Sequence, residues 1–136
     1  MFPQITGAGR GIGREVALQF AQLGCIIVCW DINLIAAKET AQEVEQIGGR
    51  AYAFRCDVSV QAEVEVTANE VRKVVPHVDI VINNAGIMPC HPFLQHNIQE
   101  IDRCIDVNVK GNIWVSFDKY LLFSHTNLVI CLAGYS

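Results

Sequence analysis

Residues 6–13 read Thr-Gly-Ala-Gly-Arg-Gly-Ile-Gly, the longest glycine-rich segment of the chain. It follows a short apolar segment and precedes residues 10–23, in which apolar side chains recur at helical spacing. The first turn of a helix presents unpaired N–H groups and a positive dipole end, both of which attract phosphate. Glycines there permit a tight turn, a close backbone approach to a ligand and close helix–strand packing. The stretch therefore predicts a phosphate site at the first strand–helix junction.

Two familiar phosphate motifs do not fit this loop. Ile12 and Arg14 stand where the last glycine of G-x-G-x-x-G would fall, and the chain contains no Gly-Lys pair as a P-loop would require. A glycine-rich turn without a ligand therefore stays open as the alternative.

Short apolar runs alternate with longer amphipathic ones along the whole chain. We expect strands at residues 5–6, 25–30, 51–56, 78–82 and 128–131, and helices at 10–23, 34–47, 59–75 and 99–123. Ser59 is expected to cap the third helix, with Glu63 near the capping-box position. This alternation predicts an α/β fold: a Rossmann-like, doubly wound parallel sheet of about five strands, forming one partial domain over residues 1–136 and incomplete at its C-terminal side.

Composition excludes several classes of protein. Of the 136 residues, 51% are hydrophobic and 18% charged, which argues against disorder. The formal net charge is −4 and the longest basic cluster is the pair at residues 72–73, so we expect no nucleic-acid partner. We identify neither a signal peptide nor a membrane segment in this sequence.

The six cysteines contain no Cys-x-x-Cys pair. Four of them, Cys25, Cys29, Cys56 and Cys131, lie in or beside apolar runs and are expected to behave as small hydrophobic residues. We therefore expect reduced thiols and an intracellular, cytoplasmic location for the chain as given. We also expect no metal site.

Asp31 directly follows the second predicted strand. A carboxylate there can accept hydrogen bonds from the adenosine ribose and repel a 2′-phosphate, which favours NAD over NADP. Arg10 favours the opposite choice, because a cation can bind a 2′-phosphate. Asp31 could instead belong to an Asp-x-Asn signal for the start of a helix.

Four motifs, in this order and spacing, resemble the short-chain dehydrogenases/reductases. They are the loop at 6–13, Cys-Asp-Val at 56–58, Asn-Asn-Ala-Gly at 83–86 and Asn108 on the long predicted helix. Trp-Asp-Ile-Asn at 30–33 is similar to the 17-beta-hydroxysteroid and retinol dehydrogenase branch. The resemblance implies an NAD(P)-dependent oxidoreductase that acts on an alcohol or ketone, with a steroid-like or retinoid-like lipid as one candidate substrate.

The resemblance also implies roles for individual residues. Asp57 would bind the adenine amine, Val58 would line the adenine pocket, and Asn108 would be catalytic. The residues implied to bind the dinucleotide are Gly7, Arg10, Gly11, Ile12, Gly13, Asp31, Asp57, Val58, Asn83, Ala85 and Gly86. As alternatives, Asp57 caps a turn, and Asn83 and Asn84 satisfy backbone groups at a strand end.

The acid/base that the family uses is not found in this sequence. Hydride transfer at an alcohol carbon needs such a group at the oxygen, and the family supplies it as Tyr-x-x-x-Lys with a nearby Ser. None of the three tyrosines has a lysine four positions later. Alignment of Ala133-Gly134 with the family places Cys131 at the Ser position, and Ser136 is a weaker candidate for that role.

Three hypotheses follow. The chain is the cofactor-binding half of such an enzyme, a non-catalytic dinucleotide-binding module, or an inactive truncated product. For a full-length relative of the suspected branch, homo-oligomers and association with the endoplasmic reticulum or lipid droplets remain open.

Overall fold

The computed structural model describes residues 1–117 and 128–132, and its centre is a parallel sheet of five strands in the order β3-β2-β1-β4-β5. The strands are β1 (Pro3–Thr6), β2 (Ile26–Asp31), β3 (Arg50–Arg55), β4 (Ile80–Asn83) and β5 (Leu128–Cys131). The main helices are α1 (Gly11–Gln22), α2 (Leu34–Gln46), α3 (Gln61–Val71), α4 (Ile98–Ile105) and α5 (Asn112–Phe117). The predicted doubly wound α/β architecture is confirmed.

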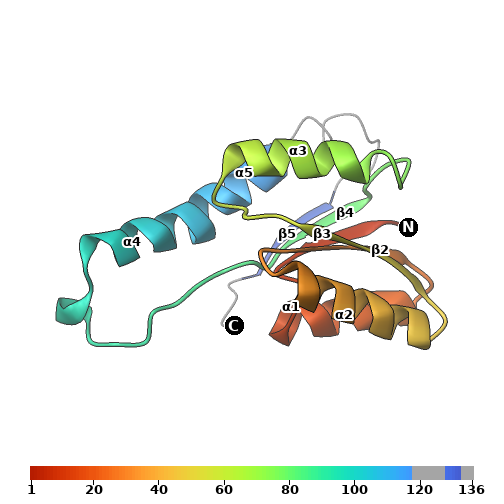
Figure 1. The fold of residues 1–136 in the computed structure, drawn as a ribbon, viewed down its shortest axis with the longest axis horizontal. Coiled ribbons are helices and arrows are strands. Elements are labelled where there is room, and N and C mark those ends of the chain that lie inside the picture. Colours follow the sequence, from red (N-terminus) through yellow and green to blue (C-terminus); the bar gives the residue numbers. More distant parts are fainter. Residues whose placement is uncertain (118–127, 133–136) are drawn as a thin grey trace.

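Strand β2 shows why both faces of the sheet need a cover. Val28 and Trp30 point into one buried cluster, whereas Ile27 and Cys29 point into the other. This alternation follows from the two-residue period of a strand. A continuous apolar run therefore supplies side chains to two hydrophobic clusters, one on each face of the sheet. Figure 1 shows α1 and α2 below the sheet and α3 and α5 above it.

The order of the strands creates a crevice beside β1. The chain proceeds from β1 outward to β2 and β3, and then returns so that β4 pairs with the other side of β1, as Ile5 opposite Ile82 shows. Parallel sheets bind ligands where the strand order reverses in this way, outside the carboxyl ends of the strands. The fold thus places the glycine loop and the ends of β2, β3 and β4 around one crevice.

Helix α3 does not begin as predicted. Its N-cap is Val60, and no side chain caps it. The Ser59 hydroxyl instead donates to Asp57 Oδ1 at 2.6 Å, and Glu63 Oε2 accepts from the Asp57 N–H at 3.0 Å. The expected cap was wrong because the turn at Asp57 uses the Ser59 hydroxyl, and the helix ends at Val71 rather than near residue 75.

The long helix predicted at 99–123 is broken into three segments. A π-helix, η2 (Asp106–Gly111), separates α4 from α5. The Asn112 side chain donates to the Asn108 carbonyl at 2.8 Å, and a Cβ on Gly111 would lie 2.8 Å from Val58 Cγ2. The wider turn therefore brings this helix against the end of β3. The predicted end at residue 123, and the pair at 133–134, lie outside the described residues.

Strand β1 is longer than predicted and begins at Pro3. A proline is tolerated there because it is the first residue of the strand.

Among the described residues, no helix has the length and apolar character needed to cross a bilayer.

Candidate cofactor site

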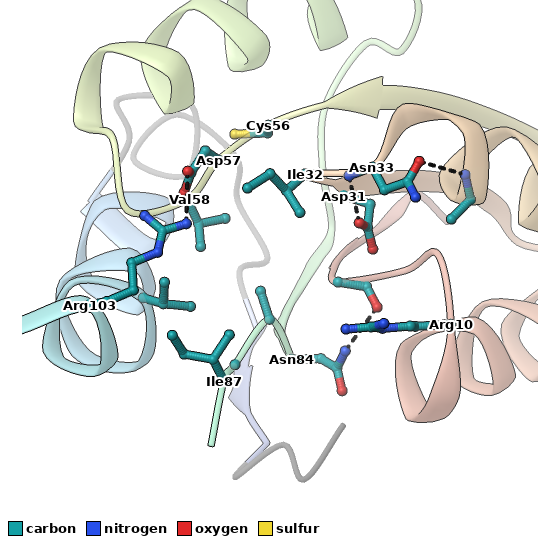
Figure 2. A pocket seen from close by; sticks show the side chains of 15 residues that line it. Arg10, Asp31, Ile32, Asn33, Cys56, Asp57, Val58, Asn84, Ile87 and Arg103 are labelled. Atoms are coloured by element: carbon teal, nitrogen blue, oxygen red, sulfur yellow. Dashed lines mark hydrogen bonds and ion pairs between the residues drawn. The ribbon is translucent and has the colours of Figure 1, made fainter. Parts of the chain in front are cut away.

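A pocket of about 280 Å³ lies outside the carboxyl ends of β1, β2, β3 and β4. Figure 2 shows Asp31 and Arg10 on one side of it, with Asp57 and Arg103 on the other. Its volume is close to the lower end of ligand pockets, which is about 300 Å³. The lining residues are Gly7, Arg10, Asp31, Ile32, Asn33, Ala36, Cys56, Asp57, Val58, Asn84, Ala85, Gly86, Ile87, Arg103 and Val107.

The glycine loop allows β1, α1 and the segment after β4 to meet without side chains between them. Gly7 has a φ of 64°, a conformation that favours glycine. A Cβ on Gly13 would lie 2.2 Å from the Gly7 oxygen and 2.5 Å from Asn84 Nδ2. Gly13 thus serves close packing, as the sequence predicted for one of these glycines.

Helix α1 begins beside the pocket without a side-chain cap. Its N-cap, Arg10, has an extended backbone and makes no side-chain capping bond. Gly11, Ile12 and Gly13 form the first turn, and they are not among the pocket-lining residues. Their position leaves the first-turn N–H groups as donors for an anion.

Asp31 both lines the pocket and fixes the loops around it. Its Oδ2 accepts from the Gly9 N–H at 2.8 Å, and its Oδ1 accepts from the Asn33 N–H at 2.9 Å. Asn33, rather than Asp31, caps α2, with its side chain accepting from the N–H groups of Ile35 and Ala36. The carboxylate at the pocket and the helix-start signal are therefore compatible.

Asp57 is tied to the far wall of the pocket. Arg103 of α4 donates to Asp57 Oδ2 at 3.0 Å and to Ser59 Oγ at 2.7 Å. Burial acts to raise the pKa of Asp57, but hydrogen bonds from Ser59 and Arg103 outweigh it and hold the pKa below its ordinary value. Asp57 also accepts from the Ser59 N–H at 3.0 Å, so it caps a turn as one alternative predicted.

Thr6 positions the strand-end segment that lines the pocket. Its hydroxyl oxygen accepts from the N–H groups of Asn84 and Ala85, both at 3.0 Å. The Asn84 side chain donates to the carbonyls of Thr6 and Gly7 at 3.0 and 3.2 Å. Asn84 therefore satisfies backbone groups of the glycine loop, and it holds Ala85 and Gly86 at the pocket wall.

Asn83, expected to bind the cofactor, and Asn108, expected to be catalytic, do not line this pocket. Asn83 donates to Ser116 Oγ at 2.9 Å and to Cys131 Sγ at 3.7 Å. The Asn108 side-chain amide makes two hydrogen bonds to the backbone of Ile87. Its Oδ1 accepts from the Ile87 N–H and its Nδ2 donates to the Ile87 carbonyl, each at 2.8 Å. Asn108 thus braces the segment after β4 from the π-helix.

The thiols divide into two groups. Cys25, Cys29 and Cys56 are buried as expected, but Cys131 is exposed on β5 at the sheet edge, so its predicted role as a core hydrophobe was wrong. Burial raises the pKa of Cys29 and of Cys56 to about 12. The Cys56 thiol at the pocket wall therefore stays protonated near neutral pH and is not a nucleophile.

Seven of the eleven residues proposed for the cofactor line this one pocket: Gly7, Arg10, Asp31, Asp57, Val58, Ala85 and Gly86. Gly11, Ile12 and Gly13 belong to the helix start, and the Asn83 side chain points to Ser116 instead. Arg103 was not predicted from the sequence, because it is 46 residues from its partner Asp57 and no local pattern marks it.

The crevice where the strand order reverses, the glycine loop and the carboxylates at the strand ends are typical of Rossmann-type domains that bind dinucleotides. The family model of the short-chain dehydrogenases matches residues 4–122, and the chain belongs to this family. Members of the family are oxidoreductases that bind NAD(P).

The relatives include enzymes named for retinoids and steroids. The chain is 43% identical over 133 residues to human (Homo sapiens) epidermal retinol dehydrogenase 2, covering 96% of this chain and 43% of that protein. It is 40% identical over 112 residues to human 17-beta-hydroxysteroid dehydrogenase 13, and this match covers 82% of this chain and 37% of that protein. The solved hydroxysteroid dehydrogenase from Escherichia coli superposes with a TM-score of 0.79 at 37% identity, covering 85% of this chain and 48% of that structure. The chain thus spans less than half the length of these proteins.

Proposed function

We propose that this chain is the NAD-binding half of a short-chain dehydrogenase that oxidises or reduces a lipid alcohol or ketone. The observation that supports it most directly is the pocket beside β1, where the strand order reverses, with the carboxylates of Asp31 and Asp57 on opposite sides of it. The similarity to proteins named retinol and hydroxysteroid dehydrogenases supports the lipid substrate.

The residues present fit an adenine dinucleotide. Apolar Ile32 and Val58 flank the space in which an adenine would lie, and the Asp57 carboxylate supplies an acceptor for its amine. The uncapped start of α1 offers N–H donors to the pyrophosphate. When bound, the nicotinamide would supply the hydride chemistry, while this chain binds and orients the cofactor.

The 136-residue chain is expected to bind NADH saturably without catalysing turnover. The glycine loop and both carboxylates are present, whereas no Tyr-x-x-x-Lys occurs in the sequence to transfer the proton. Titration followed by NADH fluorescence measures binding, and an assay over alcohols and ketones measures turnover. Cooperative unfolding without NADH binding would contradict the proposal, and turnover would overturn the expected inactivity.

Asp31 is expected to set the choice of cofactor. In the wild-type chain, repulsion between its carboxylate and a 2′-phosphate should make NADPH binding at least about tenfold weaker than NADH binding, equivalent to about 1.4 kcal/mol. Asp31→Asn removes the charge but keeps an amide oxygen for the Gly9 N–H, so it should bring the two dissociation constants closer together.

Arg10→Ala is the matched control for this prediction. It removes the cation on the same side of the pocket, so it should weaken NADPH further and change NADH little. Equal NADH and NADPH affinities in the wild-type chain would refute the role of Asp31.

A further inference from the structure

His91, His96 and Glu100 form a cluster outside the cofactor pocket. His91 lies on the loop after β4, His96 follows the 3-10 helix η1 (Phe93–Gln95), and Glu100 is in the first turn of α4. Figure 1 shows this loop leaving the sheet before it turns back into α4. The turn returns the chain on itself, so that the two imidazole rings lie with centroids 4.0 Å apart.

The Glu100 carboxylate is held beside both rings. Asn97 and Glu100 form a capping box, in which Glu100 Oε2 accepts from the Asn97 N–H at 3.1 Å. His91 Nε2 lies 3.3 Å from Glu100 Oε1, and His96 Nδ1 lies 3.7 Å from Glu100 Oε2. The helix start therefore holds the carboxylate in place for both imidazoles.

We propose that His91, His96 and Glu100 form a three-ligand site for a divalent zinc ion. Two imidazoles and one carboxylate are a known zinc ligand set, which leaves a fourth position for water or another ligand. Zinc is held about 2.0–2.2 Å from such atoms, so the ligand atoms of a tetrahedral site are about 3.3–3.6 Å apart. One ligand atom from each of the three residues already lies within 4.8 Å of the others.

A second observation supports a ligand at this place. His91 Nδ1 is buried and has no hydrogen-bond partner among the described residues. A buried polar atom of this kind calls for an explanation, and an ion or water bound at Nδ1 itself would provide one. From the sequence we expected no metal site; the turn at η1 brings these three residues together.

The proposed ion would join two walls of the cofactor pocket. It would link the loop that begins at Ile87 to the helix that carries Arg103, and both of these residues line the pocket. Zinc is therefore expected to raise the thermal stability of the chain, since it binds only the folded arrangement of the three residues.

Calorimetric titration of the chain with zinc chloride tests the site. We expect saturation at one zinc per chain at micromolar concentrations, and no competition from excess magnesium, which prefers oxygen ligands. His91→Ala, His96→Ala and Glu100→Gln should each weaken zinc binding about 100-fold. Gln can keep the capping box, so Glu100→Gln removes the ligand without removing the cap.

Controls separate this site from other zinc-binding groups in the chain. His77→Ala changes a histidine that pairs with Asp79 away from the cluster, and Cys90→Ser changes a thiol in the same loop; both should bind zinc as the wild type does. The cobalt complex should lack thiolate charge-transfer absorption. Unchanged binding in the His91 and His96 variants, loss of binding in Cys90→Ser, or no saturation at micromolar zinc would each overturn the proposal.

Discussion

Replacing Gly13 with alanine is expected to destabilise the chain by about 3 kcal/mol and to abolish measurable NADH binding. In an open helix the same change would stabilise by about 0.5–1 kcal/mol, because alanine is the better helix former. Here the new methyl would lie 2.2 Å from the Gly7 oxygen, so either α1 or the glycine loop must move. Urea denaturation and NADH titration measure the two effects.

Gly24→Ala is the matched control for Gly13→Ala. Gly24 has a φ of 80°, and a Cβ there would meet no atom within 4 Å. The change should cost about 1–2 kcal/mol through backbone strain alone and leave NADH affinity unchanged, because Gly24 is outside the pocket. If Gly13→Ala were as stable as the wild type, close packing of α1 on the loop would be refuted.

Thr6→Val is expected to destabilise the chain by about 2–5 kcal/mol, although the two side chains have nearly the same shape. Thr6 is 1% exposed, and its hydroxyl is the acceptor for two backbone N–H groups, those of Asn84 and Ala85. Valine would leave both donors without that partner. Chemical denaturation gives the loss in unfolding free energy.

The Thr6→Ser variant separates the contribution of the Thr6 hydroxyl to stability from that of its methyl group. Serine keeps the acceptor and removes one methyl group, so the expected loss is about 1 kcal/mol. The order of stability should be wild type, Thr6→Ser, Thr6→Val, with NADH binding weakened mainly in the valine variant because Ala85 and Gly86 lose their anchor. A valine variant at least as stable as the serine variant would contradict this account.

Much of the fold was predictable because it depends on local patterns. The strand period of β2 and the helical period after Gly11 are read from adjacent residues, and both were confirmed. The errors arose where partners distant in sequence intervene. The π-helix around Asn108 accompanies a double hydrogen bond to Ile87, and the Ser59 hydroxyl bonds to Asp57 instead of capping α3.

In the candidate site, too, the residues that depend on local patterns were predictable, and those that depend on distant partners were not. Asp31 and Asp57 follow predicted strands, and parallel strands end at one edge, so their meeting at one pocket followed from the topology. Arg103 and the cluster of His91, His96 and Glu100 were not predicted, because side-chain pairing across loops and helix starts leaves no periodic signal.

Local sequence patterns were enough to predict the alternation of strands and helices, the glycine loop and the kind of ligand that the loop suits. Those properties depend on backbone freedom and apolar spacing within a few neighbouring residues. The hydrogen bonds between Thr6 and Asn84, 78 positions apart, and between Arg103 and Asp57, 46 positions apart, became visible only in the folded chain. The physical reason is that such contacts depend on the order of the strands and the position of α4, which are set by the packing of the whole sheet.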